Sequence, residues 1–412
     1  MNNIAILILT ALIIETVLNF YSEFLNMNSV KTNLPDEFKD LYDEDTYKKS
    51  QEYLKANTKF GWVSSFLDLF ILMIFWFCKG FPLLDQFVRG FGYGTVVSGL
   101  IFMGIILGVK FVISLPFNIY STFVLEERFG FNKTTPKTFV VDLIKAIVLG
   151  TILGTILLSV ILAFFEYSGE YAWIYCYVGV TTFIFLIQYL YPVFIMPLFN
   201  KFEEIEDGDL KTSLMEYAKS IDFPLTKIFR MDGSKRSTKS NAFFTGFGKN
   251  KRIVLFDTLI EKHTVEELVA VLAHEMGHFK KNHIKKLMFL SILQMGVIFY
   301  LLSFFLHYDK LFNAFYMNDI SIYAGLIFFS MLFSPISFFL NIMMQHISRR
   351  HEYEADKFAV DTTSKSKNLV NALKKLSVDN LSNLNPHPLY VFLNYSHPPV
   401  MQRVEAMRKI KG

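Results

Sequence analysis

Cysteine is scarce in this sequence, and that scarcity narrows the fold class. The 412-residue chain has two cysteines, Cys78 and Cys176, and both lie in apolar stretches. Two cysteines in that setting exclude a disulfide-built scaffold and argue against cysteine-ligated zinc. We interpret both as small buried hydrophobic residues.

Charged residues are also in short supply. They make up 19% of the chain, whereas average soluble domains have about 25%. The formal net charge is only +4, too small to surround the molecule with a basic field. We therefore expect no nucleic-acid partner.

Long apolar runs take the place of charge. Hydrophobic residues account for 52% of the chain, with 45 Phe and a positive mean hydropathy. Stretches long enough to cross about 30 Å of hydrocarbon as helices recur along the chain. The first has no small-residue cleavage site after it, so we expect a retained span. The seven expected spans are 3–25, 61–82, 95–118, 139–165, 172–199, 284–307 and 321–345.

The positions of Lys and Arg predict the orientation of these spans. With the N-terminus outside, the outer loops carry at most Lys79, Arg89 and Lys310, and the opposite loops are much richer in basic residues. The positive-inside rule then places the basic loops in the cytoplasm. The expected partner of the spans themselves is the lipid bilayer. We expect a five-helix membrane domain over 1–200, a cytoplasmic domain over 201–283 and 346–412, and a transmembrane hairpin over 284–345.

The stretch "HTVEELVAVLAHEMGHFKKNH" predicts a helix that carries a metal site. Thr264 followed by Glu267 is a capping-box signal for the helix start. His274 and His278 then lie one turn apart on one face, a spacing at which two imidazoles can share one Zn²⁺. Glu275 lies beside the position where water would bind and can take its proton.

A zinc protease needs a third protein ligand, and "SRRHEYEADKFAVD" offers one. Glu352 and Asp356 are spaced i, i+4 on a second helix, so Glu352 can complete a His₂Glu site while Asp356 accepts a hydrogen bond from a ligand imidazole. Glu354 is the competing ligand, but it points about 160° away from Asp356. His283 is five residues beyond His278, about 140° round the helix, so it points elsewhere and we expect a surface or interfacial histidine there.

With these motifs in place, the chain resembles the type I CAAX prenyl proteases, a family of integral-membrane zinc metalloproteases. The resemblance covers nearly the whole length and includes "FVLEERFGFNKTTPKTFVVD", "YPVFIMPLFNKF", "LAHEMGHFKKNH", "SRRHEYEADKFA" and "HPLYVFLNYSHPPVMQR". It implies an α-helical polytopic membrane protein in which seven transmembrane helices enclose a chamber. A mainly α cytoplasmic zinc-metalloprotease domain of gluzincin type, with a small β-hairpin, would close that chamber. It implies one Zn²⁺ per chain, held by His274, His278 and Glu352, with Glu275 catalytic and Asp356 supporting a ligand.

Two further segments fit this interpretation. "STKSNAFFTGFGKNKRIVLF" alternates and turns around Gly246 and Gly248 as a hairpin does, and its edge could pair with an extended substrate that Asn241 fixes. "SHPPVMQR" contains His397 and Arg403, which the resemblance implies as stabilisers of the oxyanion.

These observations predict a zinc endopeptidase that hydrolyses peptide bonds near the C-terminus of CAAX peptide or protein substrates, prenylated or unmodified. The first alternative is a membrane quality-control protease with the same site and loose specificity. The second is a non-enzymatic membrane chaperone or transporter with a structural metal, although no fourth ligand is apparent near the motif. The composition, rich in Lys, Asn, Phe and Ile, favours a bacterial inner membrane over the endoplasmic reticulum membrane of a eukaryote.

Overall fold

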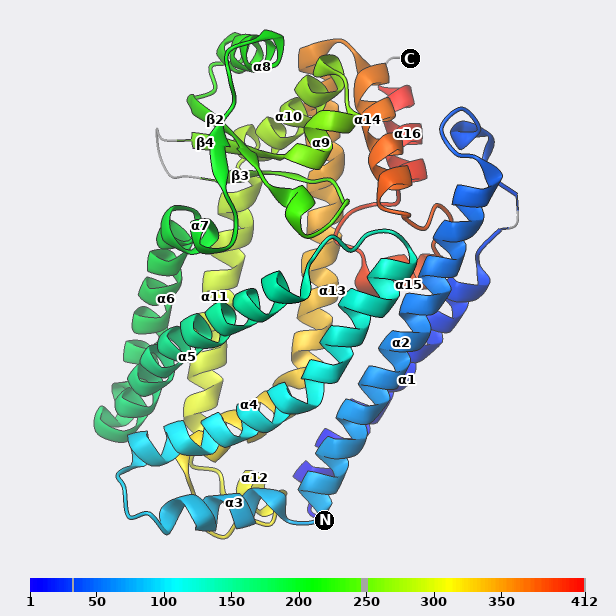
Figure 1. The fold of residues 1–412 in the computed structure, drawn as a ribbon. Coiled ribbons are helices and arrows are strands. Elements are labelled where there is room, and N and C mark those ends of the chain that lie inside the picture. The colour runs from blue at the N-terminus through cyan, green and yellow to red at the C-terminus, as the bar shows by residue number, and fades with distance from the viewer. Residues whose placement is uncertain (32, 246–250, 411–412) are drawn as a thin grey trace.

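The computed structural model describes residues 1–31, 33–245 and 251–410 and is dominated by long helices (Figure 1). Seven helical segments of the described chain are long and apolar enough to cross a membrane, as expected. They are α1 (Asn3–Asn28), α2 (Glu44–Phe77), α4 (Thr95–Tyr120) with the π-helix η2 (Ser121–Glu126), α5 (Pro136–Tyr167), α6 (Ala172–Leu190) with η4 (Tyr191–Ile195) and α7 (Met196–Phe199), α11 (His283–Phe305) and α13 (Ile322–Thr363).

The second and seventh spanning helices differ most from the boundaries expected from hydropathy. The second begins at Glu44, well before the apolar run, and ends at Phe77, because Lys79 adopts a left-handed conformation with φ of 60°. The short helix α3 (Gly80–Arg89) then follows in a new direction. The seventh continues from the apolar run through the charged segment to Thr363 as one helix of 42 residues. Glu352 and Asp356 therefore lie on the extension of a spanning helix.

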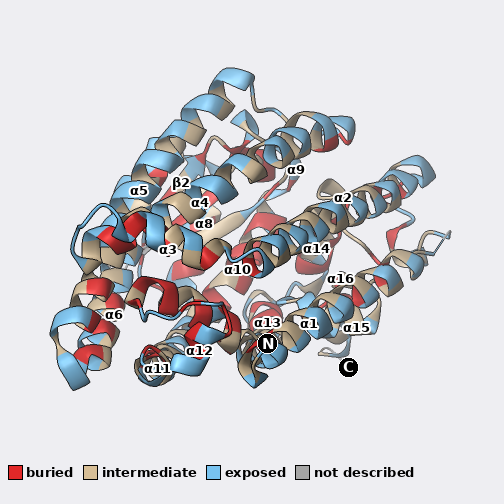
Figure 2. Ribbon diagram, turned by 90° about the horizontal axis from the view of Figure 1, so that it is seen from below, coloured by how far each residue is buried: buried red, intermediate tan, exposed pale blue. Residues whose placement is uncertain are grey.

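The spanning helices stand around a common centre and do not pack into a solid bundle. Their apolar windows bury only 6–22% of their residues. Viewed from below, they form a ring, and α10 and α14 of the polar domain are visible between them (Figure 2). Buried residues gather at the lower end, where α3 and the short helix α12 (Asp309–Asn313) pack against α13. The ring is therefore tied together at the end far from the polar domain.

The polar domain contains a small mixed sheet with helices around it. The strand order is β1-β2-β4-β3, in which β2 and β4 are parallel and the other two pairs are antiparallel. Apolar residues of the sheet and of α8, α10, α13, α14 and α16 share one core. The elements are β1 (Phe202–Glu204), α8 (Asp209–Ser220), β2 (Leu225–Met231), β3 (Ala242–Thr245), β4 (Lys251–Phe256), α9 (Asp257–Lys262), α10 (Val265–Lys280), α14 (Ser366–Asp379), α15 (Pro388–Asn394) and α16 (Val400–Lys409), with 3₁₀ turns η1 (Asp36–Phe38), η3 (Gly169–Tyr171) and η5 (Gly233–Lys235).

The expected hairpin corresponds to β3 and β4, which pair antiparallel from Ala242 opposite Leu255 to Thr245 opposite Arg252. The predicted turn at Gly246 and Gly248 lies outside the described residues. The strand order leaves β3 at an edge of the described sheet, so one side of its backbone has no neighbouring strand there.

The polar domain and the three sparsely charged loops lie at opposite ends of the molecule. Figure 1 places α8, α10, α14 and α16 at the top, and α3, α12 and the turn between α5 and α6 at the bottom. The sparsely charged loops, which the charge distribution assigns to the same side of the membrane, therefore lie together at the end opposite the polar domain.

Candidate metal centre

The first half of the site lies on α10, whose start follows from local sequence. Thr264 accepts a hydrogen bond from the backbone N–H of Glu267, and the Glu267 carboxylate accepts one from the N–H of Thr264, which is the expected capping box. Leu268, Leu272 and Met276 bury the apolar face of the helix in the polar-domain core. That packing fixes the rotation of α10, so that His274 and His278 both face α13.

The second half of the site lies on α13, which crosses α10 at unusually short distance. A Cβ atom at Gly277 would lie 3.1 Å from both Cα and the carbonyl oxygen of Ala355, and 3.2 Å from Cβ of Phe358. Only glycine leaves room for this approach without displacing the backbone. The crossing brings Glu352, which lies about one turn before Ala355 on α13, opposite the two histidines of α10.

The donor groups of the three expected ligands form a compact triangle, to which Glu352 contributes both carboxylate oxygens. The Nε2 atoms of His274 and His278 are 3.1 Å apart, and Glu352 Oε2 and Oε1 lie 3.4 Å and 3.2 Å from them respectively. Ligands of tetrahedral zinc, with bonds of ~2.0–2.1 Å, are about 3.3 Å from one another. Each of the three separations is therefore close to an edge of a zinc tetrahedron, with one Glu352 oxygen facing each histidine.

The chemistry of the donors also fits a cation. Glu352 is 3% exposed, and its Oε2 has no hydrogen-bond partner among the described residues. Arg403 Nη1 lies 3.2 Å from that oxygen but not in hydrogen-bonding geometry. A buried carboxylate oxygen without a donor is costly, and a metal ion at the centre of the triangle would satisfy it. The residues present therefore fit zinc.

Behind the triangle, Asp356 and Arg403 hold the ligands in place. Asp356 Oδ1 lies 2.9 Å from His274 Nδ1, the contact expected for this carboxylate. Arg403 donates from Nε and Nη2 to the two oxygens of Asp356, at 2.8 Å and 2.6 Å, and its Nη1 faces Glu352. The guanidinium is thus directed at two carboxylates, and the oxyanion role that the resemblance implies for Arg403 stays a prediction.

Burial and these carboxylates set the protonation of the metal-free site. Burial acts to lower the pKa of His274, but hydrogen bonds with Asp356 and Glu352 outweigh it and raise the pKa to about 9. Burial likewise acts to lower the pKa of Arg403, and the charge of Asp356 reverses this and raises it. His274 in the metal-free chain is therefore charged at neutral pH, and a cation must displace its proton.

Glu275 and His397 lie around the same centre. Glu275 is half-buried next to His274 and makes no side-chain hydrogen bond with the described part of the chain. His397 Nε2 lies 3.3 Å from Glu352 Oε1, and Ser396 Oγ is 2.9 Å from His397 Nδ1. Desolvation by the surrounding chain lowers the pKa of His397, and the charge of Glu352 opposes that change. Both side chains retain donor or acceptor capacity at the metal centre.

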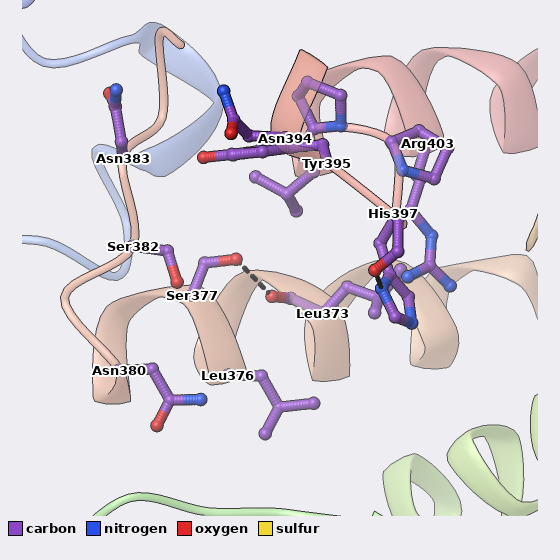
Figure 3. Close-up of a pocket in the computed structure, with 14 residues that line it drawn as sticks. Leu373, Leu376, Ser377, Asn380, Ser382, Asn383, Asn394, Tyr395, His397 and Arg403 are labelled. Carbon is purple, nitrogen blue, oxygen red and sulfur yellow. Dashed lines mark hydrogen bonds between the residues drawn. The ribbon is translucent and has the colours of Figure 1, made fainter. Parts of the chain in front are cut away.

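A pocket of about 520 Å³ opens beside His397 and Arg403, between α14 and the loops around α15 (Figure 3). Its wall combines apolar side chains with neutral polar ones, among them Ser377, Asn380 and Asn394. The pocket therefore connects the metal centre with a neutral surface on which part of a peptide could lie.

Asn241 lies immediately before the edge strand β3 and is exposed. Its side-chain oxygen accepts a hydrogen bond from the N–H of Ala242 at 2.9 Å, and its backbone oxygen accepts one from the N–H of Phe256 at 3.1 Å. The backbone N–H of Ser240 donates to Asn380 on the pocket wall at 3.3 Å. The segment thus links the start of β3 to the pocket.

His283 differs from the expectation of a surface or interfacial histidine. It is 1% exposed, and its Nδ1 lies 3.2 Å from Nδ1 of His278. The expectation assumed a continuing helix, but α10 ends at Lys280, and Asn282 takes a left-handed conformation with φ of 57°. That reversal turns His283, the first residue of α11, back toward α10. The Glu354 carboxylate lies 3.1 Å from its other ring nitrogen.

Sequence reasoning thus missed Gly277 and misplaced His283, and both residues shape the centre. The glycine could have been noticed as the one residue without a side chain between the two motif histidines. No comparable signal marks His283, because its position depends on where α10 ends.

Comparison with known proteins identifies the family of the chain. Residues 23–201 match the family described as CAAX prenyl protease N-terminal, five membrane helices, and residues 204–411 match peptidase family M48. The chain is 37% identical over 408 residues to CAAX prenyl protease 1 of Saccharomyces cerevisiae, covering 92% of this chain and 89% of that protein. It is 33% identical over 430 residues to the CAAX prenyl protease 1 homolog of Mus musculus, covering 92% and 90%.

A solved structure shows the same architecture over the full length. The crystal structure of S. mikatae Ste24p superposes with a TM-score of 0.93 at 35% identity, covering 99% of both chains. Peptidases of family M48 depend on zinc in general, and this chain has a His–His–Glu cluster of the matching kind. The chain therefore belongs to the M48 family of CAAX prenyl proteases, multi-pass membrane zinc metalloproteases whose fold it shares.

Proposed function

We propose that this metalloendopeptidase cleaves peptide bonds near the C-terminus of prenylated CAAX substrates, with one zinc ion held by His274, His278 and Glu352. The observation that carries the proposal is the triangle of donor groups, in which the contacts between His274, His278 and the two Glu352 oxygens measure 3.1, 3.2 and 3.4 Å, beside the half-buried Glu275. The substrate class comes from the relatives, which are named CAAX prenyl protease 1.

Zinc, Glu275, His397 and Arg403 have separate roles in the proposed hydrolysis. Zinc bound at this centre would supply Lewis-acid polarisation of water and of the scissile carbonyl. Glu275, which has no competing hydrogen bond in the described chain, takes the proton of the attacking water and passes it to the leaving amine nitrogen. Nδ1 of His397 can accept a hydrogen bond from Ser396, so that the ring carries its proton on Nε2. This Nε2–H donates a hydrogen bond to the oxyanion. Arg403 acts through Asp356 and Glu352, which it holds in position.

The substrate backbone is proposed to lie along β3. An extended peptide can add to a sheet edge, and β3 is the described edge strand next to the pocket. The segment before it is held at both ends, because Lys239 Nζ lies 2.9 Å from Glu126 Oε2 and the N–H of Ser240 donates to Asn380. Asn241, between these anchors and β3, is placed to fix the peptide backbone with its side-chain amide.

The orientation of the protein is part of the proposal. We propose that the zinc domain, residues 201–283 and 346–412, faces the cytoplasm and that residues 284–345 form a hairpin inserted in it. The supporting observations are the basic loops on the same side as this domain and the common core of α8, α10, α13, α14 and α16.

The deciding experiment compares matched farnesylated and unmodified CAAX peptides with purified full-length protein and its Glu275→Gln variant. We expect zinc-dependent release of the C-terminal residues, preferentially from the farnesylated peptide. Glu275→Gln should keep zinc and lose activity by about 10³–10⁴-fold, because general-base catalysis alone contributes about 10²–10⁴-fold.

Equal cleavage of both peptides would contradict the prenyl preference and support a broader endopeptidase. Activity of Glu275→Gln within about tenfold of wild type would contradict the assigned mechanism, since loss of a general base costs more than that.

A further inference from the structure

His283 and Glu354 extend the metal centre behind His278. The two Nδ1 atoms of His278 and His283 are 3.2 Å apart, and His283 Nε2 lies 3.1 Å from Glu354 Oε2. The three side chains come from three helices, α10, α11 and α13. They form a continuous line of polar contacts that starts at a metal ligand and ends at a carboxylate.

The position of each proton along this line follows from metal ligation. His278 faces the donor triangle with Nε2, so its lone pair is used there and its remaining proton is on Nδ1. Nδ1–H of His278 then donates to Nδ1 of His283, which must be an acceptor and therefore carries its own proton on Nε2. That Nε2–H donates to Glu354. Every ring nitrogen in the line has a partner with the correct polarity.

The other ligand has a shorter arrangement of the same kind. His274 Nδ1 meets Asp356 Oδ1 directly at 2.9 Å. Each imidazole of the triangle is thus supported by a carboxylate, one directly and the other through an intervening imidazole. Partners of this kind fix the tautomer and orientation of a metal-binding histidine.

Resting on the proposed zinc ligation, we propose that His283 is a positioning residue for His278 and that Glu354 sets the tautomer of His283. The pair orients the second imidazole toward the metal as Asp356 orients the first. Glu354, which the sequence suggested as a competing ligand, accepts a hydrogen bond from His283 on the side away from the metal.

Packing alone is the main competing explanation for a buried histidine at this position. The ring of His283 stacks on the ring of His351, with centroids 4.0 Å apart and planes inclined by 6°. A residue that only fills this space could be replaced by phenylalanine without effect on the metal. The hydrogen-bonding role requires an acceptor where Nδ1 lies, which asparagine can supply with its side-chain oxygen.

The test measures the zinc affinity of purified full-length protein by competition with a chelator, for His283→Phe, His283→Asn and Glu354→Ala. Loss of such supporting partners typically weakens metal binding about 10–100-fold, and we expect this for His283→Phe. His283→Asn should recover most of that loss. Glu354→Ala, which leaves the stacked ring in place, should weaken binding by about tenfold, the lower end of that range. The Co²⁺ absorption spectrum should change in His283→Phe and return toward wild type in His283→Asn.

His351→Phe is the matched control, because it keeps the stack and removes a buried histidine whose Nδ1 has no hydrogen-bond partner among the described residues. Its zinc affinity should equal that of wild type. Equal affinities of wild type and His283→Phe, or equal losses in the Phe and Asn variants, would overturn the positioning role. If His283→Phe does not fold, wild-type affinity in Glu354→Ala would overturn it. Absence of zinc binding in the wild-type protein would instead refute the proposed function itself.

Discussion

Replacement of Gly277 by alanine should weaken the metal centre without touching a ligand. The added Cβ would meet Cα and O of Ala355 at 3.1 Å, where ordinary van der Waals contact begins at 3.4 Å. Both neighbouring atoms belong to the backbone, so a flexible side chain cannot relieve the overlap. Helices α10 and α13 must move apart by a few tenths of an ångström.

The substitution has two opposing effects on folding stability. Alanine in a helix is favoured over glycine by about 0.5–1 kcal/mol, whereas overpacking at a tight contact costs about 1–3 kcal/mol. The net loss of folding stability should therefore be no more than about 2.5 kcal/mol. His274 and His278 share α10, so their separation is unchanged, but both distances to Glu352, now 3.4 Å and 3.2 Å, increase.

A displacement of a few tenths of an ångström approaches the tolerance of about 0.5 Å within which metal sites must be held, so zinc affinity should fall by about tenfold. Chelator competition and thermal denaturation of the purified protein would separate the two effects. Gly154→Ala is the matched control, since a Cβ there would meet nothing within 4 Å. Wild-type zinc affinity in Gly277→Ala would refute the argument that glycine at this crossing sets the ligand distances.

Three further predictions concern zinc and topology. Because the pKa of metal-free His274 is raised to about 9, above the ordinary 6.5, its protonation stabilises the metal-free fold at low pH and that contribution is lost as pH rises through about 9. Zinc must displace this proton, so its apparent affinity should rise about tenfold per pH unit up to that value, and an affinity that is constant between about pH 7 and 8 would contradict this. Glu352→Ala should lose stoichiometric zinc while Glu354→Ala retains it at reduced affinity, and the reverse result in metal analysis would exchange their roles. In intact cells and a cysteine-free background, Glu170→Cys should react with a membrane-impermeant thiol reagent and Lys219→Cys should not; labelling of position 219 from outside would refute the orientation.

The sequence by itself determined the features that depend on local or periodic patterns. Apolar runs of sufficient length predict spans wherever they occur, because the thickness of the bilayer sets the length of a helix that crosses it. The positions of His274 and His278 on one face follow from helical periodicity once Thr264 and Glu267 cap the helix. Glu352 could be chosen over Glu354 for a similar reason, since its spacing from Asp356 is a single turn.

Tertiary structure decided everything that depends on where one helix ends or meets another. The position of His283 could not be extrapolated around α10, because Asn282 adopts a left-handed conformation and turns the chain back. Arg403 is directed at Asp356 and Glu352 because α16 packs against α13, a contact between segments distant in sequence. Gly277 acquires its importance only from Ala355 on the crossing helix. Helical periodicity describes one helix at a time, whereas the distances that suit a metal ion arise from the packing of two.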